Sequence, residues 1–448
     1  MFPNRNFVLA RLARETKDPS LLWLLSEISY PGDQHFLNTI DPNYYSETQL
    51  TRDLRVGTDS YALLVLDDLS KPVPPLKAGV PTNFMDRGRG LVSFRSGWKP
   101  DDTMVLFDGS HRNTSAPGHE HASCGHFSVS ALGEYFAIDT GRYGIEQDQH
   151  NIVLVDGKSG HSTNGEWRNT HEHGLLIDYQ PDNFCDFAAV DSSHQHNCYW
   201  SRRSLGFVKG SPMRPEPLSH RRSLRRSAGR RGEGAPSYIW TVEDINKAND
   251  WAEFWWTLNT HPNNTIETFP DHGVIHGCRQ GNLLDIHFAL PAPESFPKPH
   301  TLAVMQDIGR CSSYKYVHDI DQFNGTFKDA NSYLAPERAV LIRPRLVAKI
   351  SGYNGRFMSV MIPRRKGGKP AKVERLPSVD NSLAVRITFA EVEDTLIWAY
   401  EHHLLEAGGI RGRGQWCVVR QSRKSGKVLA FQMGYGTSLE VGGNALKL

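Results

Sequence analysis

The chain has 448 residues, 10% of them aromatic, and a formal net charge of +2. This length allows two to four ordinary domains, or one large β architecture with a smaller attached part. The balanced charge excludes a general attraction to nucleic acid, and no apolar run approaches the roughly 20 residues that span a bilayer, so we expect neither nucleic-acid binding nor membrane insertion.

Two short helices are expected at the start of the chain. Apolar side chains recur at helical spacing over residues 6–28, and Asp18-Pro19 should interrupt them because proline breaks a helix interior. Residues 59–68 fit a helix or a strand, and four prolines follow within a few residues. We therefore place a domain boundary near residue 80, with residues 1–80 as a short helical segment and linker and residues 81–448 as a β domain.

From residue 83 onward the sequence consists of short alternating segments that end in turn residues. This pattern is typical of antiparallel strands, and it predicts a mainly β fold built on a large antiparallel β-sandwich. Alternation also predicts that Phe254 and Trp256 share one face of a strand and pack between two sheets. The segments are GLVSFRSG, TMVLFDGS, GHFSVSALG, EYFAIDTG, HNIVLVDG, SYIWTVEDI, AEFWWTLNTH, NLLDIHFALP, RPRLVAKISG, RFMSVMIP, LAVRITFA, DTLIWAYE and QWCVVRQS.

Histidine, aspartate and tyrosine side chains that could bind a metal or transfer a proton are concentrated in residues 118–144. This segment has the sequence GHEHASCGHFSVSALGEYFAIDTGRYG. His119 and His121 are two residues apart, so on a strand they share one face. If the next segment pairs with this one through the turn at residues 132–134, Asp139 returns beside the start of the first strand, and His150 follows after a loop.

Two imidazoles and one carboxylate form a ligand set that suits zinc. The alternative is that these histidines only make buried hydrogen bonds in a β core. Spacing alone leaves both interpretations open. Two further His-x-His pairs, at residues 171–173 and 194–196, weaken each pair taken by itself.

The order of these motifs resembles the β-sandwich half of the heparinase II/III-like polysaccharide lyases. The resemblance depends on SFRSGWKPDDTMVLFDGS, the His-x-His segment, Asp-x-Gly-x-Tyr and QHNIVLVDGKSG. It covers most of residues 80–448 and implies β-elimination at a uronic acid of an acidic polysaccharide, in a groove between the sandwich and a helical (α/α) toroid. The helices at residues 6–28 resemble the end of such a toroid.

The resemblance also implies roles for individual residues. His119 would assist proton transfer or neutralise the substrate carboxylate, and Tyr143 would be an acid or a substrate contact. A structural zinc ion would be held by His121, Asp139 and His150, with His126 as the competitor for the last position. Asn151 would support the ligands from outside the coordination sphere.

Two departures from the family pattern stand out. Ser123-Cys124 occupies the place where many members have an aspartate, and only about 80 residues precede the sandwich, where members carry a much longer toroid. We therefore expect either an upstream segment or a partner chain to supply the toroid, or else a non-catalytic carbohydrate-binding or structural sandwich. A zinc hydrolase built on the same histidines is a third hypothesis. The family implies the cell envelope or periplasm, whereas the lack of a signal peptide predicts a cytoplasmic protein if Met1 is the true start.

Two segments outside the histidine cluster are candidates for substrate contact. The segment DSSHQHNCYWSRRS predicts a strand with surface polar residues, and its alternative is sugar stacking by Trp200 with carboxylate binding by Arg202 and Arg203. The arginine-rich residues 218–232 predict a solvated loop, with contact to a sulfated or carboxylated chain as the alternative.

Overall fold

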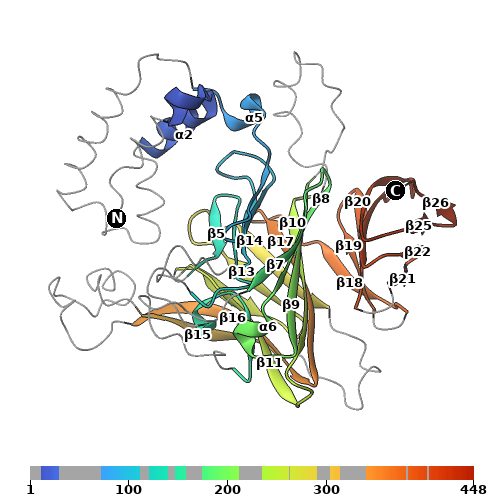
Figure 1. Ribbon diagram of the computed structural model, residues 1–448. Coiled ribbons are helices and arrows are strands. Elements are labelled where there is room, and N and C mark those ends of the chain that lie inside the picture. The colour runs from blue at the N-terminus through green and yellow to red at the C-terminus, as the bar shows by residue number, and fades with distance from the viewer. Residues whose placement is uncertain are drawn as a thin grey trace. The chain divides into compact units, whose positions relative to one another are not determined.

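A computed structural model describes much of the chain, and strands dominate it while helices are few and short (Figure 1). This confirms the expected mainly β, antiparallel fold. Within the described part, no helix is both long and apolar enough to cross a membrane. The side chains of residues 25–29, 308–312 and 340–343 are not described. The described residues are 12–29, 72–110, 121–139, 147–157, 174–210, 235–261, 263–289, 303–312, 340–379, 382–400 and 403–447.

The chain forms two compact units, and the first holds the helices at its start. It comprises residues 1–82, 97–99 and 310–342. Residues 12–16 are helical, α2 (Pro19–Ser29) follows, and α5 (Pro75–Ala78) comes after residues that lie outside the described part, residues 59–68 among them.

The break between the first two helices lies at the predicted place. Lys17 has a φ of 55°, which ends one helix. The Asp18 carboxylate accepts hydrogen bonds from the backbone N–H and the hydroxyl of Ser20 at 2.9 and 2.7 Å and so caps α2, whose first residue is Pro19. That these helices represent the end of a toroid stays a prediction.

The second unit begins with a sheet in which each strand pairs with the next along the chain. Leu132 and Gly133 join its last two strands with φ values of 54° and 73°, and Ala131 pairs with Glu134 across this two-residue turn. The predicted hairpin is therefore confirmed. The strands are β1 (Asn83–Asp86), β2 (Leu91–Arg95), β3 (Met104–Asp108), β4 (Phe127–Ala131) and β5 (Glu134–Ala137).

The central sheet has the order β12-β13-β14-β17-β10-β9-β8-β7, and its middle strands are buried on both faces. Ala188 and Val190 of β8 belong to one hydrophobic cluster, while Cys185, Phe187 and Ala189 belong to another. Its strands are β7 (Leu175–Gln180), β8 (Cys185–Asp191), β9 (Trp200–Val208), β10 (Tyr238–Asn246), β12 (Thr265–Thr268), β13 (His272–His276), β14 (Leu283–Ala289) and β17 (Asn354–Arg364).

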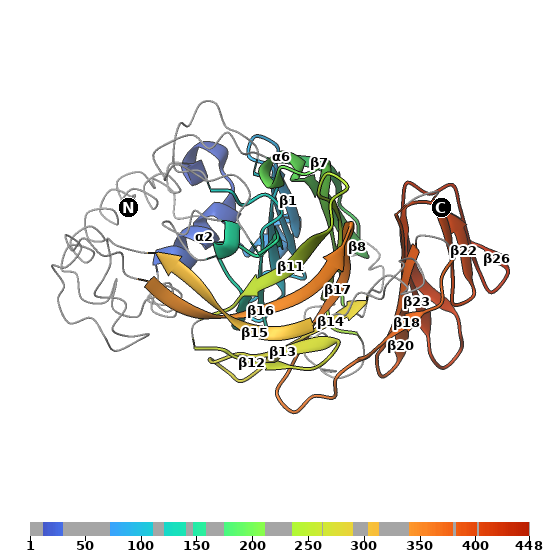
Figure 2. The same ribbon diagram turned by 90° about the horizontal axis from the view of Figure 1, so that it is seen from below.

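A further sheet has the order β15-β16-β11-β6, and its strands β15, β16 and β11 are labelled in Figure 2. This sheet shares the first cluster with the central sheet and with β2 to β5. Phe254 and Trp256 of β11 are fully buried there, as alternation predicted, whereas half-buried Trp255 carries the Lys349 ammonium 3.2 Å from its ring centroid. The strands are β6 (Val153–Val155), β11 (Ala252–Asn259), β15 (Ala303–Ser312) and β16 (Val340–Gly352).

Two C-terminal sheets extend the stack on the other face of the central sheet. Leu383, Trp398 and Trp416 of the sheet β18-β19-β20-β23-β24 lie in the second cluster with Phe187 and Trp240. The sheet β21-β22-β25-β26 covers the far side through a third cluster. The strands are β18 (Lys372–Leu376), β19 (Ser382–Thr388), β20 (Val392–Ala399), β21 (Leu404–Ala407), β22 (Ile410–Arg413), β23 (Trp416–Ser422), β24 (Val428–Gly434), β25 (Ser438–Val441) and β26 (Asn444–Ala445).

One segment differs from its prediction. We expected a strand across residues 191–204. Residues 200–204 do lie in β9, but residues 193–196 form the short helix α6 (Ser193–His196), which contacts β9 (Figure 1). Asn197 ends this helix with a φ of 52°, a left-handed conformation that asparagine tolerates better than most residues. His194 is exposed and His196 is buried, because they lie on different sides of one helical turn.

Candidate metal centre

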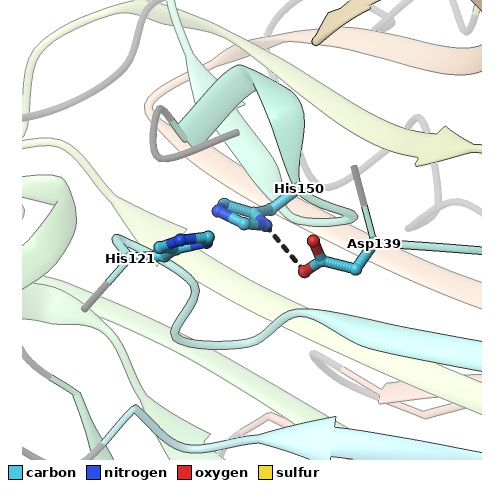
Figure 3. Close-up of side chains that lie close together, drawn as sticks. All are labelled: His121, Asp139 and His150. Atoms are coloured by element: carbon cyan, nitrogen blue, oxygen red, sulfur yellow. Dashed lines mark ion pairs between the residues drawn. The ribbon is translucent and has the colours of Figure 1, made fainter. Parts of the chain in front are cut away.

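His121, Asp139 and His150, the three predicted zinc ligands, lie together. One nitrogen or oxygen atom from each falls within 4.8 Å of the others. The rings of His121 and His150 are 5.3 Å apart, and Asp139 Oδ2 lies 3.3 Å from His150 Nδ1. In Figure 3 the His150 ring is drawn between the other two side chains.

The first sheet and its connections bring these residues together. Val129 on β4 pairs with Ala137 on β5, so Asp139, two residues past the end of β5, returns beside the start of β4. Its Oδ2 lies 3.5 Å from Nε2 of His126, the residue before β4. The 3-10 helix η1 (Gln147–Gln149) then directs His150 into the same place.

The surroundings of His150 indicate that it is a metal ligand and not an ordinary core histidine. Its side chain is 0% exposed, and neither ring nitrogen makes a hydrogen bond with a described residue, although Nδ1 lies 3.3 Å from the Asp139 carboxylate. A buried polar group without a partner costs about 1 to 3 kcal/mol, and a metal ion removes this cost by taking the nitrogen lone pair. Because Asp139 is exposed and His121 half-buried, the centre is open to solvent on one side. Two imidazoles and a carboxylate therefore fit zinc.

His126, the alternative to His150 as the third metal ligand, makes other contacts with both of its ring nitrogens. Its Nδ1 accepts the backbone N–H of Asn151 at 2.9 Å, so the proton of the neutral ring must be on Nε2. Nε2 lies 3.1 Å from the Ser128 hydroxyl and faces Asp139. Burial lowers the pKa of His126 to about 3, which keeps the ring neutral. His126 therefore orients Asp139 and does not offer a lone pair to the metal.

Asn151 fixes the surrounding backbone. Its side-chain NH₂ donates to the carbonyls of Phe127 and Ile138 at 2.8 and 3.1 Å, and its Oδ1 accepts the backbone N–H of Asn259 at 2.6 Å. These bonds tie the residue after His150 to β4, to the end of β5 and to β11. The predicted supporting role of Asn151 is thus consistent with its contacts, which run through the backbone and not to a ligand side chain.

Ser123 lies where the resemblance implied an aspartate, and the carboxylate of Asp108 reaches it here. The Ser123 hydroxyl donates to Asp108 Oδ2 at 2.8 Å, and Asp108 Oδ1 accepts the backbone N–H of Ser110. Burial raises the pKa of Asp108, while these hydrogen bonds act in the opposite direction. No sequence pattern pointed to Asp108, because it is 15 residues from Ser123 and meets it only through the pairing of β3 and β4.

Gln195 was also missed by sequence reasoning. It is fully buried in α6, and its Oε1 accepts the backbone N–H of Cys124 at 2.9 Å, while its own carbonyl accepts the Gln147 side-chain amide. α6 thus connects the loop of His121 to the 3-10 helix before His150.

Of the predicted substrate contacts, Trp200 is half-buried and Arg202 is exposed with an ion pair to Asp191 at 3.3 Å. Arg203 is only 4% exposed, since alternation along β9 turns it into the core, and its position does not support contact with a polysaccharide. His119, Tyr143, residues 171–173 and residues 218–232 lie outside the described residues.

Comparison with known proteins gives a family for the part of the chain that contains this centre. The family described as "Heparinase II/III-like, C-terminal" matches residues 88–294. No curated protein matches the sequence.

Solved structures of polysaccharide lyases are similar at low identity. Heparan sulfate lyase HepC from Pedobacter heparinus has a TM-score of 0.48 and 12% identity, over 82% of this chain and 50% of that chain. A heparinase III has a TM-score of 0.49 and 12% identity, over 82% and 53%. A Paenibacillus xanthan lyase has a TM-score of 0.40 and 11% identity, over 85% and 34%. The chain thus spans about half the length of the first two.

Proposed function

Residues 88–294 form a heparinase II/III-like C-terminal domain, and on this premise we propose that the chain supplies the β-sandwich part of a polysaccharide lyase. Its substrate is a uronic-acid polysaccharide that is cleaved by β-elimination, and a zinc ion stabilises the sandwich. The observation that carries this proposal is the His121, Asp139 and His150 group, which lies within the matched residues. The cell envelope is the location we propose, by analogy with the family.

β-Elimination at a uronic acid has three requirements. The C5 carboxylate must be neutralised, a base must remove the C5 proton, and an acid must protonate O4 as the C4–O4 bond breaks and the C4–C5 double bond forms. We assign proton transfer or carboxylate neutralisation to His119 and the acid or a substrate contact to Tyr143. His119 is two residues from His121, a proposed metal ligand, in the sequence.

Zinc in this proposal has a structural role. When bound, it supplies a cross-link between the loop of His121, the end of β5 and the turn of His150. Trp200 and Arg202 remain candidates for substrate contact, since an indole stacks on sugar rings and a guanidinium binds carboxylates. Arg203 is withdrawn from that set because it is buried.

The test is the ultraviolet absorbance of the new C4–C5 double bond when the zinc-loaded protein is mixed with a panel of uronate polysaccharides. We expect absorbance to grow for the wild type and to be lost in His119→Ala and Tyr143→Phe. His276→Ala is the control, because His276 is a half-exposed surface residue of β13 paired with Glu267.

Other products would identify the alternatives. New reducing ends without absorbance would favour a zinc hydrolase. Binding of a polysaccharide with no cleavage by the chain alone would favour a carbohydrate-binding sandwich, or a lyase that needs further residues from another segment or chain.

A further inference from the structure

Arg203 makes a buried ion pair next to the metal centre. It lies on β9 directly opposite Glu243 on β10, and its Nε donates to Glu243 Oε1 at 2.8 Å. The two side chains are 4% and 1% exposed. A buried ion pair rarely stabilises a fold more than a well-packed apolar pair does. Stability alone therefore does not explain why Arg203 and Glu243 occupy these positions.

The Glu243 carboxylate is itself fixed. Its Oε1 also accepts the Thr241 hydroxyl at 2.8 Å and the Trp256 indole N–H at 3.1 Å. Burial raises the pKa of Glu243 and lowers the pKa of Arg203, and in each case the charge of the partner acts against the effect of burial. The charge of each group thus favours the charged form of the other.

The free end of the guanidinium bridges the two segments that carry the histidine ligands. Arg203 Nη1 donates to the carbonyls of Gly125 and Asn151, both at 2.6 Å. Gly125 is four residues after His121, and Asn151 directly follows His150. The guanidinium carbon also lies 5.3 Å from the ring centroid of Phe127, the first residue of β4.

We propose that Arg203, held by Glu243, is a positioning residue of the metal centre. The Nη1 group of Arg203 fixes the distance between the segment from His121 to Gly125 and the segment that contains His150 and Asn151. The two imidazoles are thereby held in place before the metal binds. This inference rests on the proposed metal-binding function. Outer contacts of this kind typically change metal affinity by about 10- to 100-fold.

The test replaces Arg203 with lysine. A lysine ammonium has a single nitrogen and cannot reproduce the planar fork that reaches Glu243 and both carbonyls. In competition with a chromophoric chelator, we expect the zinc dissociation constant of Arg203→Lys to rise about 10- to 100-fold.

Arg420→Lys is the matched control. Arg420 on β23 makes an equally buried bidentate pair with Asp394 on β20, at 2.8 and 2.6 Å, away from both ligand loops. Both variants should unfold at lower urea concentration than the wild type, but only Arg203→Lys should lose zinc affinity. Equal affinities for zinc in the two variants would overturn the proposal.

A double variant covers the case in which Arg203→Lys does not fold. Arg203→Gln combined with Glu243→Gln leaves no uncompensated buried charge, keeps an acceptor for Thr241 and Trp256, and removes the bridge to the two carbonyls. It should also lose at least tenfold in zinc affinity, and wild-type affinity in this variant would refute the positioning role. If the wild type itself binds no zinc, it is the metal-binding function that fails.

Discussion

Replacing Asn151 with alanine should destabilise the sandwich strongly. The side chain is fully buried and makes three short hydrogen bonds, to the carbonyls of Phe127 and Ile138 and from the N–H of Asn259. Each lost bond costs about 1 kcal/mol net and more where the remaining group is buried without a partner, so three give a loss of about 3 to 6 kcal/mol.

Urea unfolding with zinc chelated measures this loss without a contribution from metal binding. Asn444→Ala is the control, because Asn444 is exposed and makes one long hydrogen bond, so its change should stay within about 0.5 kcal/mol. Asn151→Asp should be at least as damaging as Asn151→Ala near neutral pH, since it directs a buried negative charge at two carbonyl oxygens. A loss below about 1 kcal/mol in Asn151→Ala would refute the reasoning.

Three further predictions concern pH, packing and metal. Burial lowers the pKa of His196 to about 4, so folded His196 stays neutral where the unfolded chain takes up a proton; its stabilising contribution is complete above about pH 6.5 and is lost as pH falls toward 4. In urea unfolding at several pH values, the free energy of unfolding of the wild type should fall by about 3 kcal/mol more than that of His196→Gln over this range. Parallel pH profiles of the two proteins would contradict the lowered pKa of His196. Gly206→Ala should cost about 1 to 3 kcal/mol or more in the same assay, because its Cβ would overlap the Trp240 indole ring; a neutral effect would show that the indole can move. Removing zinc with a chelator should lower the melting temperature, by the equivalent of about 2.7 kcal/mol if zinc had been present at about 100 times its dissociation constant, and an unchanged melting temperature would argue against a bound ion.

The sequence predicted those parts of the fold that depend on local pattern. The hairpin at Leu132-Gly133 followed from a glycine between two alternating segments, and with it came the approach of Asp139 to the start of β4. The strand β8, which is buried on both faces, was not predicted. Residues 185–190 of β8 are all buried, so they show no alternation.

The support around the centre could not be predicted because it depends on the register of distant strands. Arg203 and Glu243 are 40 residues apart and meet only because β9 pairs with β10 in one particular register. Alternation alone indicates that Arg202 and Arg203 face opposite sides of β9, but not which of them faces the core. Gln195 was assigned to a strand, whereas a single helical turn places it between the two ligand loops.

The central claim is that His121, Asp139 and His150 hold a zinc ion, and metal analysis after dialysis against zinc tests it most directly. The account predicts about one equivalent of zinc in the wild type, as expected for a single site of this ligand set. It also predicts that zinc is lost in His150→Ala and retained, with weaker affinity, in His126→Ala. Zinc retained in His150→Ala, or absent from the wild type, would contradict it.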